Sequence, residues 1–299
     1  MGCLKCEAAV LDLQFCGNFA LRVVYCPKKG RDLPGEKRIG MTQIFDTHAH
    51  YDDEAFDQDR EELLKQLPEK GIARVVNVGA GLASCKRTAG LMADYDYIYG
   101  AMGVHPEETA GLQEGDMDWL GQQCRLDKCV AVGEIGLDYY WDSPDRETQK
   151  RWFARQLELA REVKLPVIIH SRDAAKDTLD ILKAAKAGEI GGVIHCYSYT
   201  KETAREFLNM DFYFGIGGVL TFSNAKKLKE AAEYIPLNRI VLETDCPYLA
   251  PVPNRGKRNS SLNLPHVAAA LAQIRGLSQE ELLKTVWDNS LRLYRMEQA

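Results

Sequence analysis

The stretch Ile44-Phe45-Asp46-Thr47-His48-Ala49-His50 begins with apolar residues and ends with two histidines. It is the first of eight short apolar or β-branched runs, and helical patterns separate each run from the next. This alternation indicates βα units around a parallel sheet. The eight runs cover residues 44–50, 74–79, 97–104, 129–137, 166–170, 192–196, 212–219 and 239–245.

Eight such units predict a closed (β/α)8 TIM barrel, an α/β fold that typically takes about 250 residues. The alternative is an open, doubly wound sheet. The Gly-x-Gly-x-x-Gly fingerprint expected for the dinucleotide-binding form of that sheet does not follow the first run. We therefore expect residues 41–299 to form one barrel domain, with its chemistry at the C-terminal ends of the strands.

The clearest helical pattern covers residues 144–163, where apolar residues recur at three- and four-residue steps. Ser143 is the expected N-cap, and Asp145 lies where the positive end of the helix favours a carboxylate. After the last strand and a Pro-rich loop, two amphipathic segments near 262–274 and 278–290 are expected to close the outer layer of the barrel.

Composition narrows the class of protein without selecting a substrate. The 299 residues are 45% hydrophobic and carry a net charge of -5, so a nucleic-acid partner would need a local basic patch and metal. Apolar stretches stay shorter than the roughly 18 residues of a membrane span. Polar residues interrupt the N-terminal segment, which therefore lacks the apolar core of a signal peptide. We expect a soluble, cytoplasmic protein with no membrane partner.

Residues 1–40 show no sustained period and are expected to lie outside the barrel domain. They are interpreted as a disordered extension or as a leader translated from a misassigned start codon, with Met41 as the natural start. A four-thiolate zinc knuckle is a less favoured alternative, because the second cysteine pair lacks the usual short spacing. Its thiolates would come from Cys3, Cys6, Cys16 and Cys26.

Six acidic or histidine side chains stand at the predicted C-terminal ends of strands. Side chains two apart on a strand share a face, so His48 and His50 can hold one ion. Glu134 ends an otherwise apolar strand, where burying an unpaired carboxylate is costly and a cation removes that cost. The predicted metal ligands are His48, His50, Glu134, His170, His195 and Asp245.

This ligand set is larger than a single tetrahedral zinc site requires, and it suits two ions that share a bridging carboxylate. A two-metal site lowers the pKa of a bound water and offsets charge on the attacking and leaving oxygens, which are the needs of a hydrolase. The cofactors are therefore expected to be two divalent ions. Magnesium, manganese and zinc stay open, because imidazoles favour zinc or manganese whereas phosphodiester hydrolysis often uses magnesium.

Six motifs in order resemble those of the TatD-like metal-dependent hydrolases, over about residues 42–295. The motifs begin with Phe45-Asp46-Thr47-His48-Ala49-His50-Tyr51-Asp52 and Gly103-Val104-His105-Pro106-Glu107. They continue with Val132-Gly133-Glu134-Ile135-Gly136-Leu137-Asp138-Tyr139, His170-Ser171-Arg172-Asp173, His195-Cys196-Tyr197-Ser198 and Glu243-Thr244-Asp245-Cys246-Pro247-Tyr248-Leu249.

The resemblance implies a barrel of the amidohydrolase superfamily with divalent-metal-dependent deoxyribonuclease activity. By position, His48, His50 and Asp245 would bind the first ion and His170 and His195 the second. Glu134 would bridge the two ions, and Asp245 would also accept a proton from the nucleophilic water.

A DNA substrate calls for cations that contact phosphates and aromatic faces that stack on bases. Arg255, Lys257 and Arg258 follow the last strand and resemble a basic stretch of the family, although Ser260-Ser261 replaces the Glu-Pro that often follows. Tyr139, Tyr140 and Trp141 after the Glu134 strand are candidates for base stacking, and His105 is a candidate for contacting a phosphate oxygen or assisting proton transfer. The structural alternatives are a solvated basic loop and a tyrosine that packs at the rim.

The leading functional prediction is a deoxyribonuclease that removes nucleotides from the ends of single-stranded DNA by means of a metal-activated water. A second enzymatic alternative is a hydrolase of small amides, lactones or esters, because two-metal barrels also attack carbonyl carbon. A non-catalytic nucleic-acid or protein-interaction module is the third alternative. The sequence gives no prediction of oligomeric state.

Overall fold

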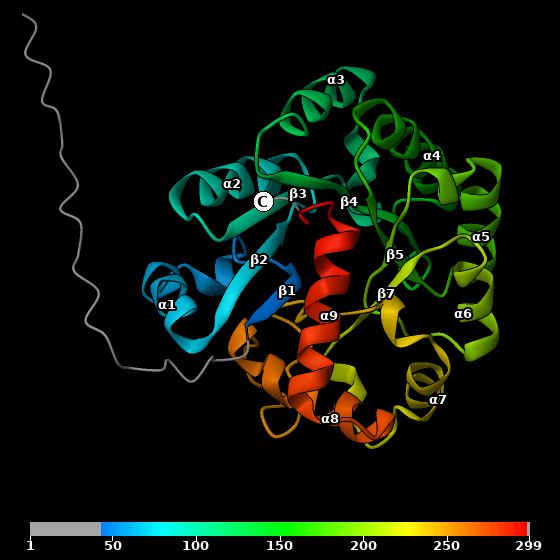
Figure 1. Ribbon diagram of the computed structural model, residues 1–299. Helices are drawn as coiled ribbons and strands as arrows, with labels where there is room; N and C mark the ends of the chain where they lie inside the picture. Colours follow the sequence, from blue (N-terminus) through cyan, green and yellow to red (C-terminus); the bar gives the residue numbers. More distant parts are fainter. Residues whose placement is uncertain (1–42, 298–299) are drawn as a thin grey trace, which may run out of the picture. The chain divides into compact units, whose positions relative to one another are not determined.

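The computed structural model describes residues 43–297. The predictions made for residues 1–40, including the zinc knuckle, lie outside the described residues. Within the described part, eight parallel strands pair in sequence order, and a bridge between Ala49 and Cys246 joins the last strand region to the first. The predicted (β/α)8 barrel is confirmed, and Figure 1 shows its strands surrounded by helices.

Each strand except the last is followed by at least one helix before the next strand begins. The strands are β1 (Ile44–Ala49), β2 (Ile72–Val78), β3 (Ile98–Met102), β4 (Cys129–Asp138), β5 (Val167–Arg172), β6 (Gly192–Ile194), β7 (Tyr213–Ile216) and β8 (Ile240–Leu242). The α-helices are α1 (Arg60–Gln66), α2 (Leu82–Asp94), α3 (Glu114–Gln123), α4 (Arg146–Val163), α5 (Ala175–Ala184), α6 (Lys201–Leu208), α7 (Lys226–Tyr234), α8 (Leu264–Arg275) and α9 (Gln279–Leu293).

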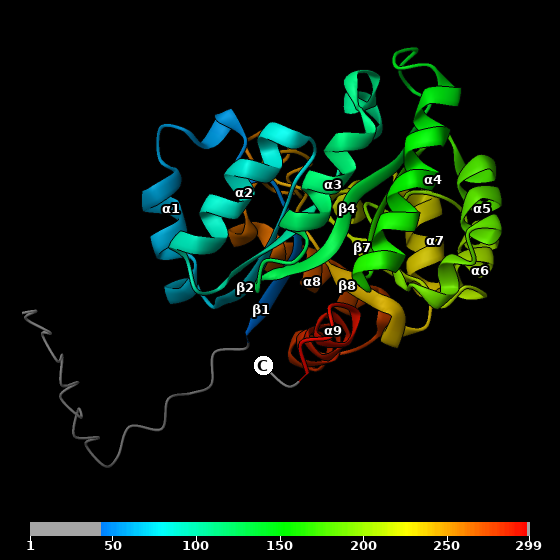
Figure 2. The same ribbon diagram turned by 90° about the horizontal axis from the view of Figure 1, so that it is seen from above.

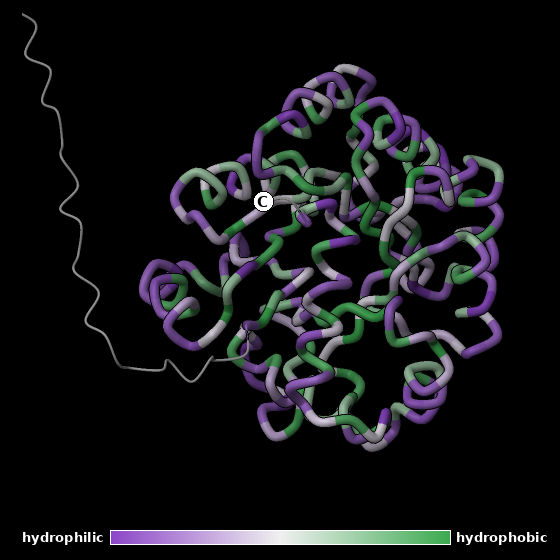
Figure 3. The backbone as a smooth tube through the Cα atoms, in the orientation of Figure 1, coloured by the Kyte–Doolittle hydropathy of each residue, from purple (hydrophilic) through white to green (hydrophobic). Residues whose placement is uncertain are grey.

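Two apolar cores hold the barrel together. The larger core fills the layer between the strands and the surrounding helices, and the smaller one lies among side chains such as Val76, Ala131 and Ile168 on the other face of the strands. Burial on both faces explains why the strands read as nearly continuous apolar runs. In Figure 3 hydrophobic residues concentrate along the central strands, whereas the outer helices carry hydrophilic faces.

Helix α9 closes the end of the barrel where the strands begin. Leu293, at its C-terminus, belongs to the smaller core, and Asn289 donates a hydrogen bond to the carbonyl of Ile240 at the start of β8 (2.7 Å). In Figure 2, α9 lies at the end of the barrel where β1 begins. The expectation that 278–290 completes the outer layer was therefore incomplete, because this segment also covers the barrel interior.

The N-terminus of α4 is capped by a different residue from the one expected. The side chain of Asp145 accepts hydrogen bonds from the backbone amides of Glu147 (3.1 Å) and Thr148 (3.0 Å). The helix starts at Arg146, so Ser143 lies too far upstream to cap it. Asp145 is thus the N-cap, and the prediction of Ser143 was wrong.

Three strands end before ligands that were assigned to them. β1 ends at Ala49, directly before His50. β6 ends at Ile194 and β8 at Leu242, so His195 and Asp245 occupy the turns that follow. The chain leaves β8 because the amide of Asp245 bonds to the carbonyl of His48 (2.9 Å) instead of continuing the β7 ladder. These turns still deliver both side chains to the C-terminal end of the barrel.

Within residues 43–297, no helix is both long enough and apolar enough to cross a bilayer.

Candidate metal centre

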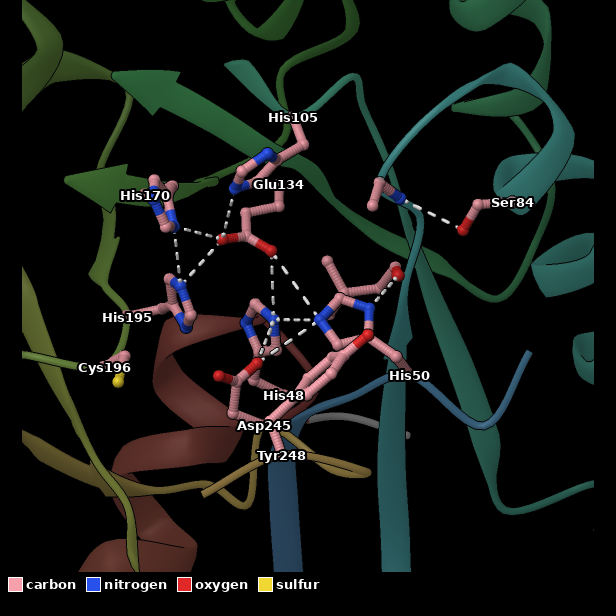
Figure 4. A network of polar contacts seen from close by, with 12 residues as sticks. His48, His50, Ser84, His105, Glu134, His170, His195, Cys196, Asp245 and Tyr248 are labelled. Atoms are coloured by element: carbon pink, nitrogen blue, oxygen red, sulfur yellow. Dashed lines mark hydrogen bonds and ion pairs between the residues drawn. The ribbon is translucent and has the colours of Figure 1, made fainter. Parts of the chain in front are cut away.

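The six predicted ligands converge at the C-terminal end of the barrel, as Figure 4 shows. Nε2 of His48 lies 3.0 Å from Nε2 of His50, and Nε2 of His195 lies 2.7 Å from Oε1 of Glu134. Oδ1 of Asp245 lies 3.4 Å from Nε2 of His50. Side chains from strands β1, β4 and β5 and from the segments that follow β1, β6 and β8 therefore point to one small volume. Glu134 lies within β4, which continues to Asp138, so the prediction that Glu134 ends its strand was wrong.

Glu134 lies at the centre of this cluster, and its two oxygens face different histidines. Oε2 lies 3.3 Å from Nε2 of His48, on the side of His50 and Asp245. Oε1 lies 2.7 Å from Nδ1 of His170 and faces His195. A carboxylate in this position can serve two cations at once, one on each oxygen.

Burial and neighbouring charges set the protonation of the cluster. Burial opposes ionisation of Glu134, which is 3% exposed, yet the facing His195 and hydrogen bonds from the surrounding histidines hold its pKa well below the usual range. Burial lowers the pKa of His48, and the nearby His195 lowers it further. An ionised carboxylate beside a neutral imidazole is the form in which both side chains bind a metal.

The donor set fits divalent metal ions. At 3.0 Å apart, Nε2 of His48 and Nε2 of His50 can share at most one proton if both rings are neutral. Nδ1 of His50 lies 2.8 Å from the carbonyl oxygen of Val78, which can only accept, so the His50 proton is on Nδ1. The Nε2 lone pair of His50 then faces the other donors, and a cation among them would satisfy it.

Four groups of three side chains within residues 43–297 have ligand atoms close enough to hold an ion, and all four belong to this cluster or border it. Two of them share Glu134, one with His48 and His50 and the other with His170 and His195. A further group joins Asp245 to His48 and His195. The arrangement agrees with the two-ion expectation, while the number and identity of the ions stay predictions.

A cavity of about 710 Å³ opens above the cluster. Among the described residues, its charged lining contains two arginines, Arg87 and Arg172, and a larger number of acidic side chains. The acidic residues are Asp52, Asp53, Glu107, Glu108, Glu134, Asp138 and Asp245. Carboxylates therefore outnumber arginines in the lining of the cavity.

Of two residues predicted to contact substrate, one lines the cavity and the other does not. His105 lines the cavity, with Nε2 3.8 Å from Oε1 of Glu134. Tyr139 instead turns its hydroxyl to Asp177 on α5 (2.7 Å), outside the lining. The structure thus brings His105 to the centre and directs Tyr139 away from it.

The basic loop after β8 also lies outside the cavity lining. Arg258 pairs with Asp59 and lies over the ring of Phe56. Arg255 lies over the ring of Phe222, with its guanidinium carbon 4.2 Å from the ring centre, and Lys257 is exposed. Contacts between this loop and a substrate stay predictions, because such contacts would need a substrate that extends beyond the cavity.

Arg172 and Asp138 are cavity residues to which the sequence assigned no part in the site. The guanidinium carbon of Arg172 lies 3.8 Å from the ring centre of Tyr140. Asp138 was quoted only as part of a motif. A usable signal was present, because the two-residue period places Asp138 on the face of Glu134 in the same strand.

Comparison with known proteins places this geometry in a family. The family profile described as TatD related DNase matches residues 45–295, which include all six candidate ligands. The chain belongs to the TatD family. The resemblance inferred from the six motifs is thereby confirmed.

Individual TatD-family proteins match over nearly their whole length. The metal-dependent hydrolase YabD of Bacillus subtilis is 42% identical over 85% of this chain and 99% of its own length. The metal-dependent hydrolase YcfH of Escherichia coli K12 is 35% identical over 85% of this chain and 96% of its own. The crystal structure of the TatD homologue YjjV from Escherichia coli superposes with a TM-score of 0.80 at 30% identity, covering 85% and 98% of the two chains.

These matches support a metal-dependent hydrolase of the TatD family. They agree with the cluster of histidines and carboxylates at the barrel mouth. Among the alternatives drawn from the sequence, a hydrolase is thus favoured over a non-catalytic interaction module. The choice between a phosphodiester and a small ester or amide substrate depends on the cavity.

Proposed function

We propose that this TatD-family hydrolase is a divalent-metal-dependent deoxyribonuclease that cleaves phosphodiester bonds at DNA ends. The observation that carries the proposal is the stack of Arg172, which lines the cavity of the metal centre, on Tyr140, which follows the cavity residue Asp138 by two positions and is not part of the lining. The proposal also draws on the family description as TatD related DNase.

The Arg172–Tyr140 pair offers both features that a single-stranded nucleic acid requires. Arg172 supplies a cation beside the metal centre, and Tyr140 is 54% exposed. Trp141 is 53% exposed and meets Tyr140 edge to face, with ring centres 4.8 Å apart. Stacking of a base on an aromatic ring contributes about 1–3 kcal/mol, and cation–π contacts from arginine add to it.

The size of the cavity favours a strand end over an internal segment of duplex. Pockets for small ligands range from about 300 to 1,000 Å³, and this one measures about 710 Å³. A terminal nucleotide fits such a volume. A base pair inside a duplex cannot enter it, because stacking on the neighbouring base pairs keeps it within the helix. The proposed activity is therefore exonucleolytic and prefers single strands.

Divalent ions bound to the cluster would lower the pKa of a water molecule and offset negative charge on the scissile phosphate. His48, His50 and Asp245 would hold one ion, His170 and His195 the other, and Glu134 both. The carboxylate of Asp245, 17% exposed at its side chain, is also open to the cavity and would accept the proton of the attacking water. His105 lies where it would contact an oxygen of the phosphate.

The test is an assay of the purified protein on end-labelled single- and double-stranded DNA with Mg²⁺, Mn²⁺ or Zn²⁺. The Glu134→Ala variant, prepared in parallel, controls for contaminating nucleases. We expect metal-dependent release of nucleotides from single strands, and its loss in the variant. Equal activity of the variant, or cleavage of a chromogenic carboxylic ester in the absence of DNA cleavage, would reject the proposal. The second result would favour the small-ester alternative.

A further inference from the structure

Asp138 lies beside His170 on the side away from the other predicted ligands. Its Oδ2 is 2.9 Å from Nε2 of His170, whereas Nδ1 of the same ring is 2.7 Å from Oε1 of Glu134. We infer that Asp138 is a positioning residue of the metal centre, which holds the Nε2 proton of His170 and leaves the Nδ1 lone pair free for a metal ion. This inference depends on the metal centre and not on DNA being the substrate.

The chemistry of a neutral imidazole carries the first step. One ring nitrogen bears a proton and the other bears a lone pair, and the partner of the protonated nitrogen selects the tautomer. The carboxylate of Asp138 is 1% exposed and accepts from Nε2. Because that contact holds a proton on Nε2, the proton that His170 gives up on binding a metal ion is the one on Nδ1, which faces Glu134.

The Asp138 carboxylate is itself held in one orientation. Its Oδ1 accepts a hydrogen bond from the amide of Tyr140 (2.9 Å), so only Oδ2 is directed at His170. Buried Gln149, on α4, clamps the backbone on both sides, since it accepts from the amide of Asp138 (2.9 Å) and donates to its carbonyl (2.9 Å). A carboxylate fixed in this way also fixes the plane of the His170 ring.

The same side chains suggest a competing arrangement, in which a third ion lies among His105, Asp138 and His170. That ion would need a lone pair on Nε2 of His170, and the ring would then have to give up both protons to serve two ions. His105 also argues against it. Its Nδ1 accepts from the amide of Glu107 (3.3 Å), so the proton of a neutral ring is on Nε2, the nitrogen that faces Glu134.

Loss of a hydrogen-bonding partner of a metal-ligating histidine typically lowers metal affinity about 10- to 100-fold. The variant Asp138→Asn keeps the shape of the side chain but has only one acceptor oxygen. If that oxygen keeps the bond to Tyr140, the amide group faces His170 as a donor. His170 must then accept at Nε2, which moves its proton to Nδ1, toward the metal.

The experiment measures metal binding and the His170 tautomer, and it does not rely on activity. Metal-free wild type, Asp138→Asn and the control Asp177→Asn are titrated with Zn²⁺ against a competing chelator. Asp177 is a suitable control because it lies on neighbouring α5, accepts from Tyr139 and lies outside the cavity lining. Unfolding of the metal-free proteins in urea separates a change in affinity from a loss of fold.

We expect the affinity for the weaker-bound Zn²⁺ to fall 10- to 100-fold in Asp138→Asn and to stay within twofold of wild type in Asp177→Asn. In the Zn²⁺-loaded wild type, ¹⁵N spectra of the His170 ring should show a proton on Nε2 and the metal on Nδ1. The spectrum tests the inference even if Asp138→Asn does not fold.

Three results would overturn the inference. One is an unchanged Zn²⁺ affinity in folded Asp138→Asn, and another is a spectrum with the metal on Nε2 of His170. The third is three Zn²⁺ per chain in wild type and two in Asp138→Asn, which would make Asp138 a ligand of a third ion.

Discussion

The carboxylate of Asp46 accepts two hydrogen bonds from Thr244, one from its backbone amide (3.0 Å) and one from its hydroxyl (2.7 Å). Both residues are buried. Asp46 lies within β1 and Thr244 directly precedes Asp245, so this pair joins the first strand to the turn after the last one. The relative placement of His48 and Asp245 therefore depends on a contact between residues 198 positions apart.

Replacing Thr244 with valine removes the hydroxyl donor and leaves Oδ2 of Asp46 with Ser261 as its side-chain donor (2.6 Å). Loss of one partner of a buried polar group costs roughly 1–3 kcal/mol. We expect Thr244→Val to lower the free energy of unfolding of the metal-free protein by that amount, measured in urea. In the control Thr285→Val, where the lost hydroxyl is on an exposed helix face, the change should stay within about 0.5 kcal/mol. Equal losses in the two variants would contradict the prediction.

Asp145→Ala should lower the thermal midpoint by roughly 2 °C at pH 7 through loss of the α4 cap, whereas Ser143→Ala should leave it unchanged. A hydrogen bond from the Thr148 hydroxyl holds the pKa of Asp145 below its usual value, and hydrogen bonds from the helix amides lower this pKa further. A depressed carboxyl pKa stabilises the fold above the unfolded pKa of about 3.9 and loses this effect as pH falls. The difference between Asp145→Ala and wild type should therefore shrink between pH 5 and pH 3. Scanning calorimetry at both pH values measures it, and a difference that grows on acidification would be inconsistent with the cap.

Removal of metal should abolish binding of DNA as well as its cleavage. Carboxylates outnumber arginines in the lining of the cavity, and bound divalent ions would add the positive charge that attracts a phosphodiester chain. We expect at least tenfold weaker binding of a phosphorothioate-protected single strand in EDTA than with Mn²⁺ at equal ionic strength. Fluorescence anisotropy measures this difference. Equal affinity in both conditions would mean that cations outside the cavity bind the strand, as the sequence predicted for the loop 255–258.

Arg172→Ala should raise KM for single-stranded DNA about tenfold with a smaller effect on kcat, because on the proposed function the residue would contact the strand away from the reacting atoms. Arg172→Lys should recover only part of the loss, since lysine keeps the charge but stacks poorly on Tyr140. Steady-state kinetics on a labelled oligonucleotide give both constants. The same measurement on Arg255→Ala compares the two candidate contact sites, and a larger effect there would favour the loop over the cavity arginine.

The fold and the convergence of the six candidate ligands could be predicted because both depend on local patterns. Alternating strand and helix periods define the barrel, and parallel strands bring their C-terminal ends to one face. Glu134 was identifiable because a carboxylate in an apolar run needs a partner. The same argument applied to Asp138 would have found it, since it lies four residues further along the same buried strand.

The substrate contacts and the exact helix ends could not be predicted in the same way, because they depend on contacts between distant residues. The sequence places Arg258 near the barrel mouth, but only the fold shows that Asp59 engages it. Likewise, Tyr139 and Tyr140 are adjacent in sequence, and their roles separate only because Asp177 binds one and Arg172 covers the other. The position of α9 was missed because an amphipathic period does not show which surface a helix covers.

Because α9 and the side chains of the smaller core fill the base of the barrel, the cavity opens at the opposite end, beside the metal centre. A polymer end that enters cannot leave through the other side, and a released nucleotide must leave by the route that the remaining strand still occupies. On the proposed function, each cleavage would require at least partial withdrawal of the strand. The architecture thus favours distributive trimming, in which the enzyme returns to the pool of strands after a few cuts.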